Sequence, residues 1–242
     1  MGQLVWISGA SSGIGRALVD AIPWPEARIV NISRRPVAGI ENLELDLVNP
    51  TSWEVVARSF EREVASFDGE LAVFVHSAGT LSPIGFAGEV PADSYTRAVL
   101  LGSAAPQVLG SAFLAALRKV RGRGVRGLIV MLTSGAATNP YEGWTAYGAG
   151  KAAIDQWVRT AGREQKSRGD HCRVLAVAPG LVETAMQEEI RATATTDFPD
   201  VDDFREYHRS GIIRSPEVAA REIWRLVRDR DLENGAVEDL RR

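Results

Sequence analysis

Short runs of apolar, often β-branched residues alternate along this chain with longer segments in which apolar residues recur every three or four positions. Two of the short runs, Leu71–Val75 and Leu128–Leu132, contain no polar residue at all. Strands that are apolar throughout are typical of a parallel sheet covered on both faces. The pattern predicts seven strands, at Leu4–Ser8, Arg28–Ser33, Asn42–Leu45, Leu71–His76, Gly127–Thr133, Arg173–Ala178 and Ala236–Glu238.

The longer segments have helical spacing and readable start signals. Asn49 before Pro50, and Ser215 before Pro216, each place a capping side chain ahead of a proline, whose missing N–H costs nothing in a first turn. We expect Asp93 to cap a long helix. The predicted helices are Arg16–Ile22, Trp53–Phe67, the segment from Asp93 to Lys119, Ala146–Arg168 and Glu217–Arg228.

Strands that alternate with helices require crossover connections, which place helices on both faces of the sheet. The prediction is therefore an α/β fold: a single doubly wound Rossmann-like domain over residues 1–242, with a mostly parallel seven-stranded sheet. We expect residues 183–214 to form a lid over a substrate. Phe198, Phe204 and Tyr207 lie within the polar part of this segment, where they either line the pocket or fasten the lid.

Composition narrows the possible functions. The 242 residues carry 28 basic and 31 acidic side chains, so the net charge of −3 argues against nucleic acid as a partner. A single cysteine and three scattered histidines give no metal site. No apolar run approaches the roughly 18 residues that would span a bilayer, and no basic-then-apolar secretory signal begins the chain. We expect a cytoplasmic protein without a membrane partner.

A glycine-rich turn follows the first predicted strand and opens the first helix. Its glycines, Gly9, Gly13 and Gly15, permit a tight turn, a close approach to a pyrophosphate and close packing of helix on sheet. The free N–H groups of a helix N-terminus would then face the phosphates. In open α/β sheets ligands bind beyond the carboxyl ends of the strands, so the residues that follow the other strands complete this site.

The second strand ends in Ser33, Arg34 and Arg35, where an acidic residue would favour NAD. Because guanidinium groups pair bidentately with phosphate, we expect a preference for NADPH over NADH; two solvated arginines are the alternative. Asp46 could accept a hydrogen bond from adenine or simply cap a turn. The turns after later strands would hold the ribose and the nicotinamide, through Ser77, Ala78, Gly79, Pro179, Gly180 and Thr184.

A tyrosine and a lysine, Tyr147 and Lys151, lie four residues apart on one predicted helix, and Ser134 follows the fifth strand. The chain has only three lysines, so a chance pairing at this spacing is improbable. A nearby ammonium and an oxidised nicotinamide would both lower the pKa of the phenol, which suits a proton donor or acceptor. Ser134 would hydrogen-bond the substrate oxygen as charge develops on it.

Together, Gly9-x3-Gly13-x-Gly15, His76-Ser77-Ala78-Gly79, Ser134, Tyr147-x3-Lys151 and Pro179-Gly180 resemble the short-chain dehydrogenase/reductase family over nearly the whole chain. The resemblance implies a Rossmann fold, catalytic roles for Ser134, Tyr147 and Lys151, and cofactor contacts that extend to Ser11, Ser12, Ile14, Leu47 and Val182.

The last sixty residues look most like the sepiapterin reductase and benzil reductase subgroup. That likeness implies substrate contacts from Met186 and from Asp239, which a solvated acidic tail would equally explain. Two positions depart from the family. His76 replaces an asparagine, which could loosen a tether between strands, and Gly102 falls where the family has a catalytic asparagine.

The expected function is therefore an NADPH-dependent carbonyl reductase, with Tyr147 as general acid and a ketone or vicinal diketone as its small-molecule substrate. Two alternatives stay open: an NADP(H)-sensing regulatory protein without turnover, for which Gly102 leaves room, and an alcohol dehydrogenase that runs in the oxidative direction. By analogy with the family, the two long helices would form a homodimer or a tetramer.

Overall fold

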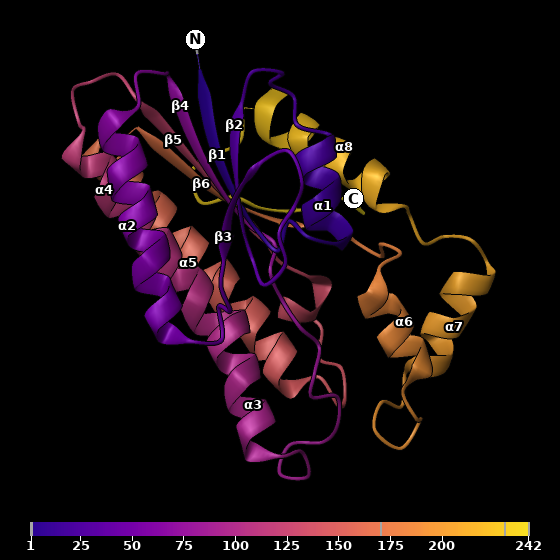
Figure 1. Cartoon of the computed structure of the whole chain (residues 1–242). Helices are drawn as coiled ribbons and strands as arrows, with labels where there is room; N and C mark the ends of the chain where they lie inside the picture. Colours follow the sequence, from indigo (N-terminus) through magenta and orange to yellow (C-terminus); the bar gives the residue numbers. More distant parts are fainter. Residues whose placement is uncertain (1, 170, 230, 242) are drawn as a thin grey trace.

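Seven parallel strands form the centre of the protein, in the spatial order β3-β2-β1-β4-β5-β6-β7. The computed structural model describes residues 2–169, 171–229 and 231–241, so the predicted domain ends, Met1 and Arg242, lie outside the described residues. The predicted single-domain, doubly wound fold is confirmed (Figure 1). The strands are β1 Gln3–Ser8, β2 Arg28–Ser33, β3 Glu41–Glu44, β4 Leu71–His76, β5 Arg126–Leu132, β6 Cys172–Ala178 and β7 Val237–Asp239.

Alternate side chains of the central strands β1, β4, β5 and β6 enter two separate cores. Leu4 and Trp6 of β1 face one core, whereas Val5 and Ile7 face the other, and all four are fully buried. In the first core the Trp6 ring contacts Phe60 and Phe113 edge-on, and its indole N–H donates to the Ser59 hydroxyl at 3.2 Å. Burial on both faces explains why the central strands are apolar throughout.

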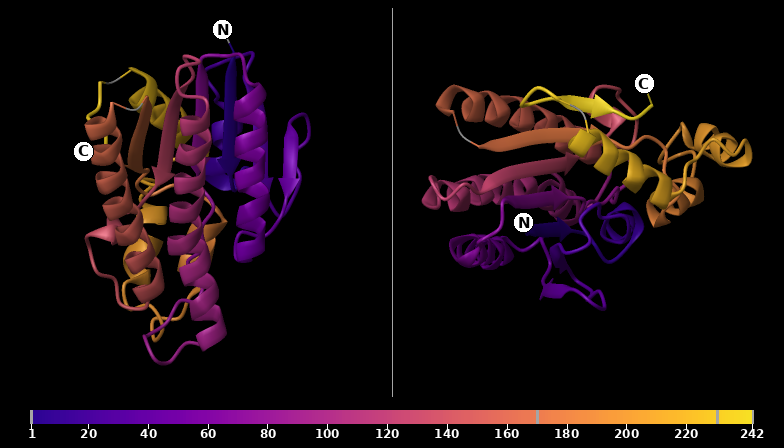
Figure 2. Two further views of the ribbon diagram at one scale, coloured as in Figure 1. Left: turned by 90° about the vertical axis from the view of Figure 1, so that its left-hand side faces the viewer. Right: turned by 90° about the horizontal axis from the view of Figure 1, so that it is seen from above.

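Helices cover both faces of the sheet (Figure 2). One layer holds α2 Pro50–Ser66, α4 Ala105–Lys119 and α5 Thr145–Arg168; the other holds α1 Gly13–Asp20 and α8 Pro216–Asp229. The cap predicted at Asn49 is confirmed, because its side chain accepts from the Thr51 N–H at 3.1 Å.

The long helix predicted from Asp93 to Lys119 begins differently and is interrupted. Helix α3, Ala92–Val99, starts directly after Pro91, so Asp93 lies in its first turn and is not the cap. A π-helical turn at Leu100–Ala104 then separates α3 from α4. Turns of this kind occur frequently at functional sites, and this one contains Gly102.

Taken together, Ala92–Lys119 is long and apolar enough to cross a membrane by length and composition, with a mean hydropathy of 1.5 over its best window. The sequence expectation that no segment approaches this limit is wrong. Core helices of non-membrane proteins meet the same criterion, and α4 contributes Leu109 and Phe113 to the first core. Part of this helical segment is nevertheless not covered by the rest of the protein, since Val99 and Val108 are exposed.

Two short helices, α6 Ala185–Ala192 and α7 Val201–Arg209, form most of the lid segment at residues 183–214 (Figure 1). A third apolar cluster fixes them to the rest of the protein. Phe198 is fully buried and stacks on Trp144 with ring centroids 4.6 Å apart, and Phe204 packs against both rings. Glu183 adds a polar anchor by accepting hydrogen bonds from Arg191 at 2.6 and 3.2 Å.

Candidate active site

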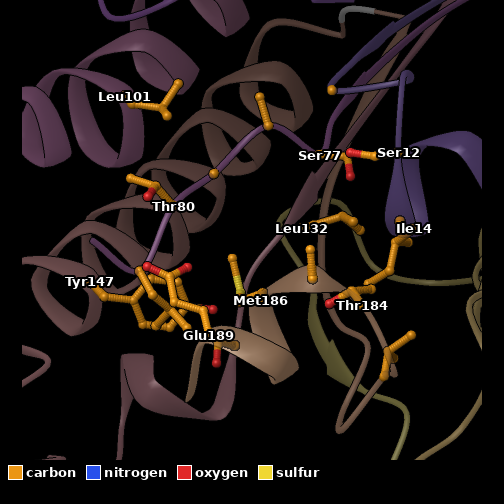
Figure 3. A pocket seen from close by; sticks show the side chains of 18 of the residues that line it. Ser12, Ile14, Ser77, Thr80, Leu101, Leu132, Tyr147, Thr184, Met186 and Glu189 are labelled. Atoms are coloured by element: carbon orange, nitrogen blue, oxygen red, sulfur yellow. The ribbon is translucent and has the colours of Figure 1, made fainter. Parts of the chain in front are cut away.

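A cavity of about 860 Å³ opens beyond the carboxyl ends of the strands and beneath the lid segment (Figure 3). With the exceptions of Gly15 and Asp239, the predicted site residues all line it. They are Gly9, Ser11, Ser12, Gly13, Ile14, Ser33, Arg34, Arg35, Asp46, Leu47, Ser77, Ala78, Gly79, Ser134, Tyr147, Lys151, Pro179, Gly180, Val182, Thr184 and Met186.

The glycine-rich turn between β1 and α1 is shaped by close backbone approaches. Gly9 has φ +72°, and a Cβ there would lie 2.9 Å from the Ala78 nitrogen. Gly15 does not line the cavity, because it is buried against the turn: its Cβ would lie 2.2 Å from the Gly9 carbonyl oxygen. Gly15 therefore serves the packing of α1 on the turn, and the open N-terminus of α1 is left for an anionic ligand.

The segment after β2 presents both predicted arginines at one end of the cavity. Arg34 and Arg35 are exposed, and the Ser33 hydroxyl donates to the Arg35 carbonyl at 2.7 Å, which fixes the turn that carries them. Asp46 lines the same end and also accepts from the Val48 N–H at 3.0 Å. This hydrogen bond stabilises a turn, and the predicted contact with adenine stays a prediction. The second carboxylate oxygen of Asp46 lies 3.7 Å from Arg97.

Lys151 is buried on α5, and its ammonium donates to the carbonyl of Leu132, the last residue of β5, at 2.8 Å. Burial lowers the pKa of Lys151 to about 8, an effect that the negative charge of Asp155 opposes. The hydrogen bond fixes the ammonium beside the cavity, 5.6 Å from the centre of the Tyr147 ring.

Ser134, Tyr147 and Lys151, which the sequence placed at one sheet edge, are brought together. In the protein alone, burial raises the pKa of Tyr147, and a hydrogen bond with Ser134 opposes that rise. The sequence predicted a lowering by the nearby ammonium and an oxidised nicotinamide together, and in the protein alone burial has the larger effect. Desolvation penalises a buried phenolate, and the positive charge of an oxidised nicotinamide is absent from the protein alone.

His76 and Ser8 tether the ends of β4 and β1. The Ser8 hydroxyl accepts from the Ser77 and Ala78 N–H groups at 3.1 and 3.2 Å, and lies 3.0 Å from the Nδ1 atom of His76. Because that hydroxyl is already an acceptor twice, its proton is donated to Nδ1. The sequence suggested that His76, in place of the family asparagine, could loosen a tether between strands. Here the Ser8–His76 hydrogen bond provides such a tether.

Gly102 occupies the π-helical turn, facing α5. Its carbonyl oxygen would lie only 3.0 Å from a Cβ at Gly150, so the two glycines let the turn and α5 approach closely. A Cβ on Gly102 would meet nothing within 4 Å, which leaves open space where an asparagine side chain would extend.

The substrate end of the cavity contains residues that the motifs did not identify. Figure 3 shows Met186 and Glu189 of α6 on the same side of the pocket as Tyr147. Of the lid aromatics, Phe204 lines the cavity, whereas Phe198 and Tyr207 only fasten the lid. Further lining residues outside any motif are Leu81, Ser82, Tyr141, Trp144, Leu181, Gln187, Ile190 and Arg241.

Asp239 lies in β7 and does not line the cavity. Its carboxylate accepts from the backbone N–H of Arg241 at 2.9 Å and from the Arg241 guanidinium at 2.6 to 3.1 Å. It is Arg241 that reaches the cavity wall. No motif could identify this residue, because its place depends on the pairing of β7 with β6.

Comparisons with known proteins show the family to which this chain belongs. The family model described as short chain dehydrogenase matches residues 3–195. A benzil reductase ((S)-benzoin forming) of Bacillus subtilis is 31% identical over 99% of this chain and 98% of its own length. A benzil reductase of Saccharomyces cerevisiae is 27% identical over 94% of this chain and 90% of its own.

Solved structures share the fold. A short chain dehydrogenase/reductase of Saccharomyces cerevisiae superposes with a TM-score of 0.83, at 22% identity, covering 98% of this chain and 96% of that one. ElxO with NADP bound gives a TM-score of 0.77, at 21% identity, over 99% and 97% of the two chains. This chain therefore belongs to the short chain dehydrogenase family, whose fold binds nicotinamide cofactors, and it is an oxidoreductase that acts on carbonyl or alcohol groups.

Proposed function

We propose that this protein is an NADPH-dependent carbonyl reductase that converts a ketone or vicinal diketone into an alcohol. One observation carries the proposal: Ser134, Tyr147 and Lys151 line the same cavity as the glycine-rich turn and the arginine pair. A cofactor laid along that cavity would have its phosphates at the N-terminus of α1 and its reactive ring beside Tyr147.

The residues present fit NADPH. The open N-terminus of α1 and the exposed Arg34 and Arg35 would hold anionic groups, and Lys151 would hydrogen-bond ribose hydroxyls. Val182 and Thr184 follow β6 and would contact the nicotinamide end. When bound, NADPH supplies a hydride to the carbonyl carbon.

Tyr147 would donate the proton that the carbonyl oxygen requires. Because burial raises its pKa, the phenol stays protonated at neutral pH in the protein alone. Ser134 would hydrogen-bond the same oxygen, and Lys151 would stabilise negative charge that develops on Tyr147. A protonated phenol is the general acid that reduction of a carbonyl requires.

The substrate end of the cavity suits an aryl ketone. Tyr141, Trp144 and Phe204 provide aromatic surface, and Met186 and Ile190 add flexible and branched apolar side chains. Two of the relatives are benzil reductases, and benzil is an aromatic vicinal diketone, so it is the first substrate to test.

The test is oxidation of NADPH, followed spectroscopically, with benzil, sepiapterin and simple quinones as substrates. The proposal predicts turnover of at least one of them. Tight NADPH binding without turnover of any carbonyl would contradict it and would favour the alternative, an NADP(H) sensor. Substituting Asn for Gly102, which has open space around it, then shows whether the family side chain changes turnover.

Replacing Arg34 with alanine tests the cofactor preference. The variant should lose NADPH affinity by roughly 10–100-fold, since a charge-assisted pair with phosphate contributes about 1.5–3 kcal/mol. NADH affinity should change little. Fluorescence titration of both cofactors measures the two constants, with Arg209→Gln on the outer side of α7 as a control. Equal losses for NADPH and NADH would show that Arg34 does not contact the 2′-phosphate.

We further propose a homodimer, in which a second copy covers the partly exposed helical segment Ala92–Lys119 together with α5. Exposed Val99 and Val108 support an apolar contact there. Sedimentation equilibrium distinguishes monomer, dimer and tetramer. A cytoplasmic location stays a prediction from the sequence.

A further inference from the structure

Arg241 is a fixed cation in the wall of the substrate pocket. The Asp239 carboxylate holds its Nε and Nη2 atoms, with the closest contact at 2.6 Å, and raises the pKa of Arg241 above its usual value. A guanidinium has five N–H groups. Among the described residues, no hydrogen bond or ion pair uses the Nη1 atom.

Two glycines make room for this side chain beside the catalytic serine. A Cβ at Gly135, the residue after Ser134, would lie 2.7 Å from Nη2 of Arg241, and a Cβ at Gly180 would lie 2.9 Å from its Cγ. Any larger residue at either position would displace Arg241. The guanidinium therefore lies against the turns that follow β5 and β6, close to Ser134 and far along the cavity from Arg34.

Lys151 and Glu183 also line the cavity, but Lys151 is buried and donates to the Leu132 carbonyl, and Glu183 is paired with Arg191. Glu189 of α6 is a further acidic group at the substrate end. Its carboxylate accepts a hydrogen bond from the Ser82 hydroxyl in the segment after β4, whereas Arg241 lies against the turns that follow β5 and β6. An anionic substituent would be repelled by Glu189 and attracted by Arg241. The two charges together would favour one orientation of a charged substrate.

We propose that Arg241 is a specificity residue that binds a carboxylate on the substrate, so that the enzyme prefers carboxylate-bearing ketones, such as 2-oxo acids, over their neutral esters. The inference rests on the proposed reductase function and names its substrate class. The reaction itself balances without Arg241: hydride from NADPH goes to the carbonyl carbon, a proton goes from Tyr147 to its oxygen, and solvent water returns a proton to Tyr147. The carboxylate is unchanged, and NADP⁺ and the hydroxy acid are the products.

The experiment uses two matched pairs of ketones, phenylglyoxylate with its methyl ester and 4-acetylbenzoate with its methyl ester. In the intact enzyme, kcat/KM should be higher for the acid in at least one pair. In Arg241→Gln that acid-to-ester ratio should fall about tenfold or more, because a charge-assisted hydrogen bond contributes on the order of 1.5–3 kcal/mol. Arg241→Lys keeps the charge and should retain part of the preference. Arg209→Gln is the control and should leave the ratio unchanged.

Several results would overturn the inference. One is an ester preferred over its acid in both pairs by the intact enzyme, and another is an equal change for acid and ester in Arg241→Gln. If that variant does not fold, inhibition of the intact enzyme is the test. Benzoate should compete with the ketone more strongly than benzamide does. Increasing salt should weaken the inhibition by benzoate and leave the inhibition by benzamide unchanged. Reduction of the esters without any acid preference would remove only this inference, whereas no reduction of any ketone would remove the proposed function as well.

Discussion

Tyr147→Phe is expected to lower the rate of carbonyl reduction by roughly 10²–10⁴-fold, the range in which general acids contribute. Hydride transfer leaves negative charge on the carbonyl oxygen, and the phenol is the donor placed to neutralise it. The phenyl ring keeps the edge-on contact with Trp144, whose ring centre is 5.6 Å away, so the pocket should keep its shape. NADPH affinity should be nearly unchanged, because the arginine pair and the α1 N-terminus are untouched.

Single-turnover kinetics and a fluorescence titration of NADPH measure the two quantities separately. The matched control is Tyr207→Phe, which removes a phenol from a lid residue outside the cavity lining and should leave the rate unchanged. A Tyr147→Phe enzyme with a nearly normal rate would contradict the assigned role. Loss of NADPH binding in the same variant would also contradict it, because the phenol would then serve the cofactor site.

The strands and the cofactor end of the site could be predicted because their signals are local. An apolar run such as Leu71–Val75 is buried on both faces, and the glycine-rich turn needs only its immediate neighbours. Parallel topology then brings the ends of β1, β2, β4, β5 and β6 to one edge of the sheet, which is why Ser134 and Lys151 meet there. The predicted bounds of β2 and β4 match the observed ones, and the other five strands differ by one residue at one or both ends.

Features that depend on tertiary packing were not predictable. Helices α6 and α7 lie in a segment that the sequence shows as polar, and their buried residues, Ile190, Val201 and Phe204, pack into a cluster with Trp144, Phe198 and other residues distant in sequence. Arg241 enters the cavity because β7 pairs with β6, which no local pattern indicates. The direction of the Tyr147 pKa depends on the depth of burial, and the spacing of a tyrosine and a lysine does not report this.

His76 shows how a departure from a family pattern changes stability. Its side chain is 1% exposed beside the Ser8 hydroxyl, and burial, with the positive charge of Lys151 nearby, lowers its pKa to about 3. The unfolded histidine titrates near pH 6.5. Between these values the unfolded chain binds a proton that the folded protein excludes, so stability is complete above about pH 6.5 and decreases as the pH falls.

Consequently, the free energy of unfolding should fall by about 2 kcal/mol between pH 7 and pH 5 on account of His76 alone. His76→Asn, which introduces the residue usual in the family, should lose this part of the acid sensitivity. For a chain of this size the difference corresponds to a melting temperature about 4–8 °C lower at pH 5. Urea denaturation at several pH values measures it, and the exposed His171, changed to Asn, is the control that should keep the full pH dependence. Identical pH dependence in His76→Asn and the unmodified protein would mean that the imidazole takes up its proton in the folded state, at the cost of placing a second cation beside Lys151.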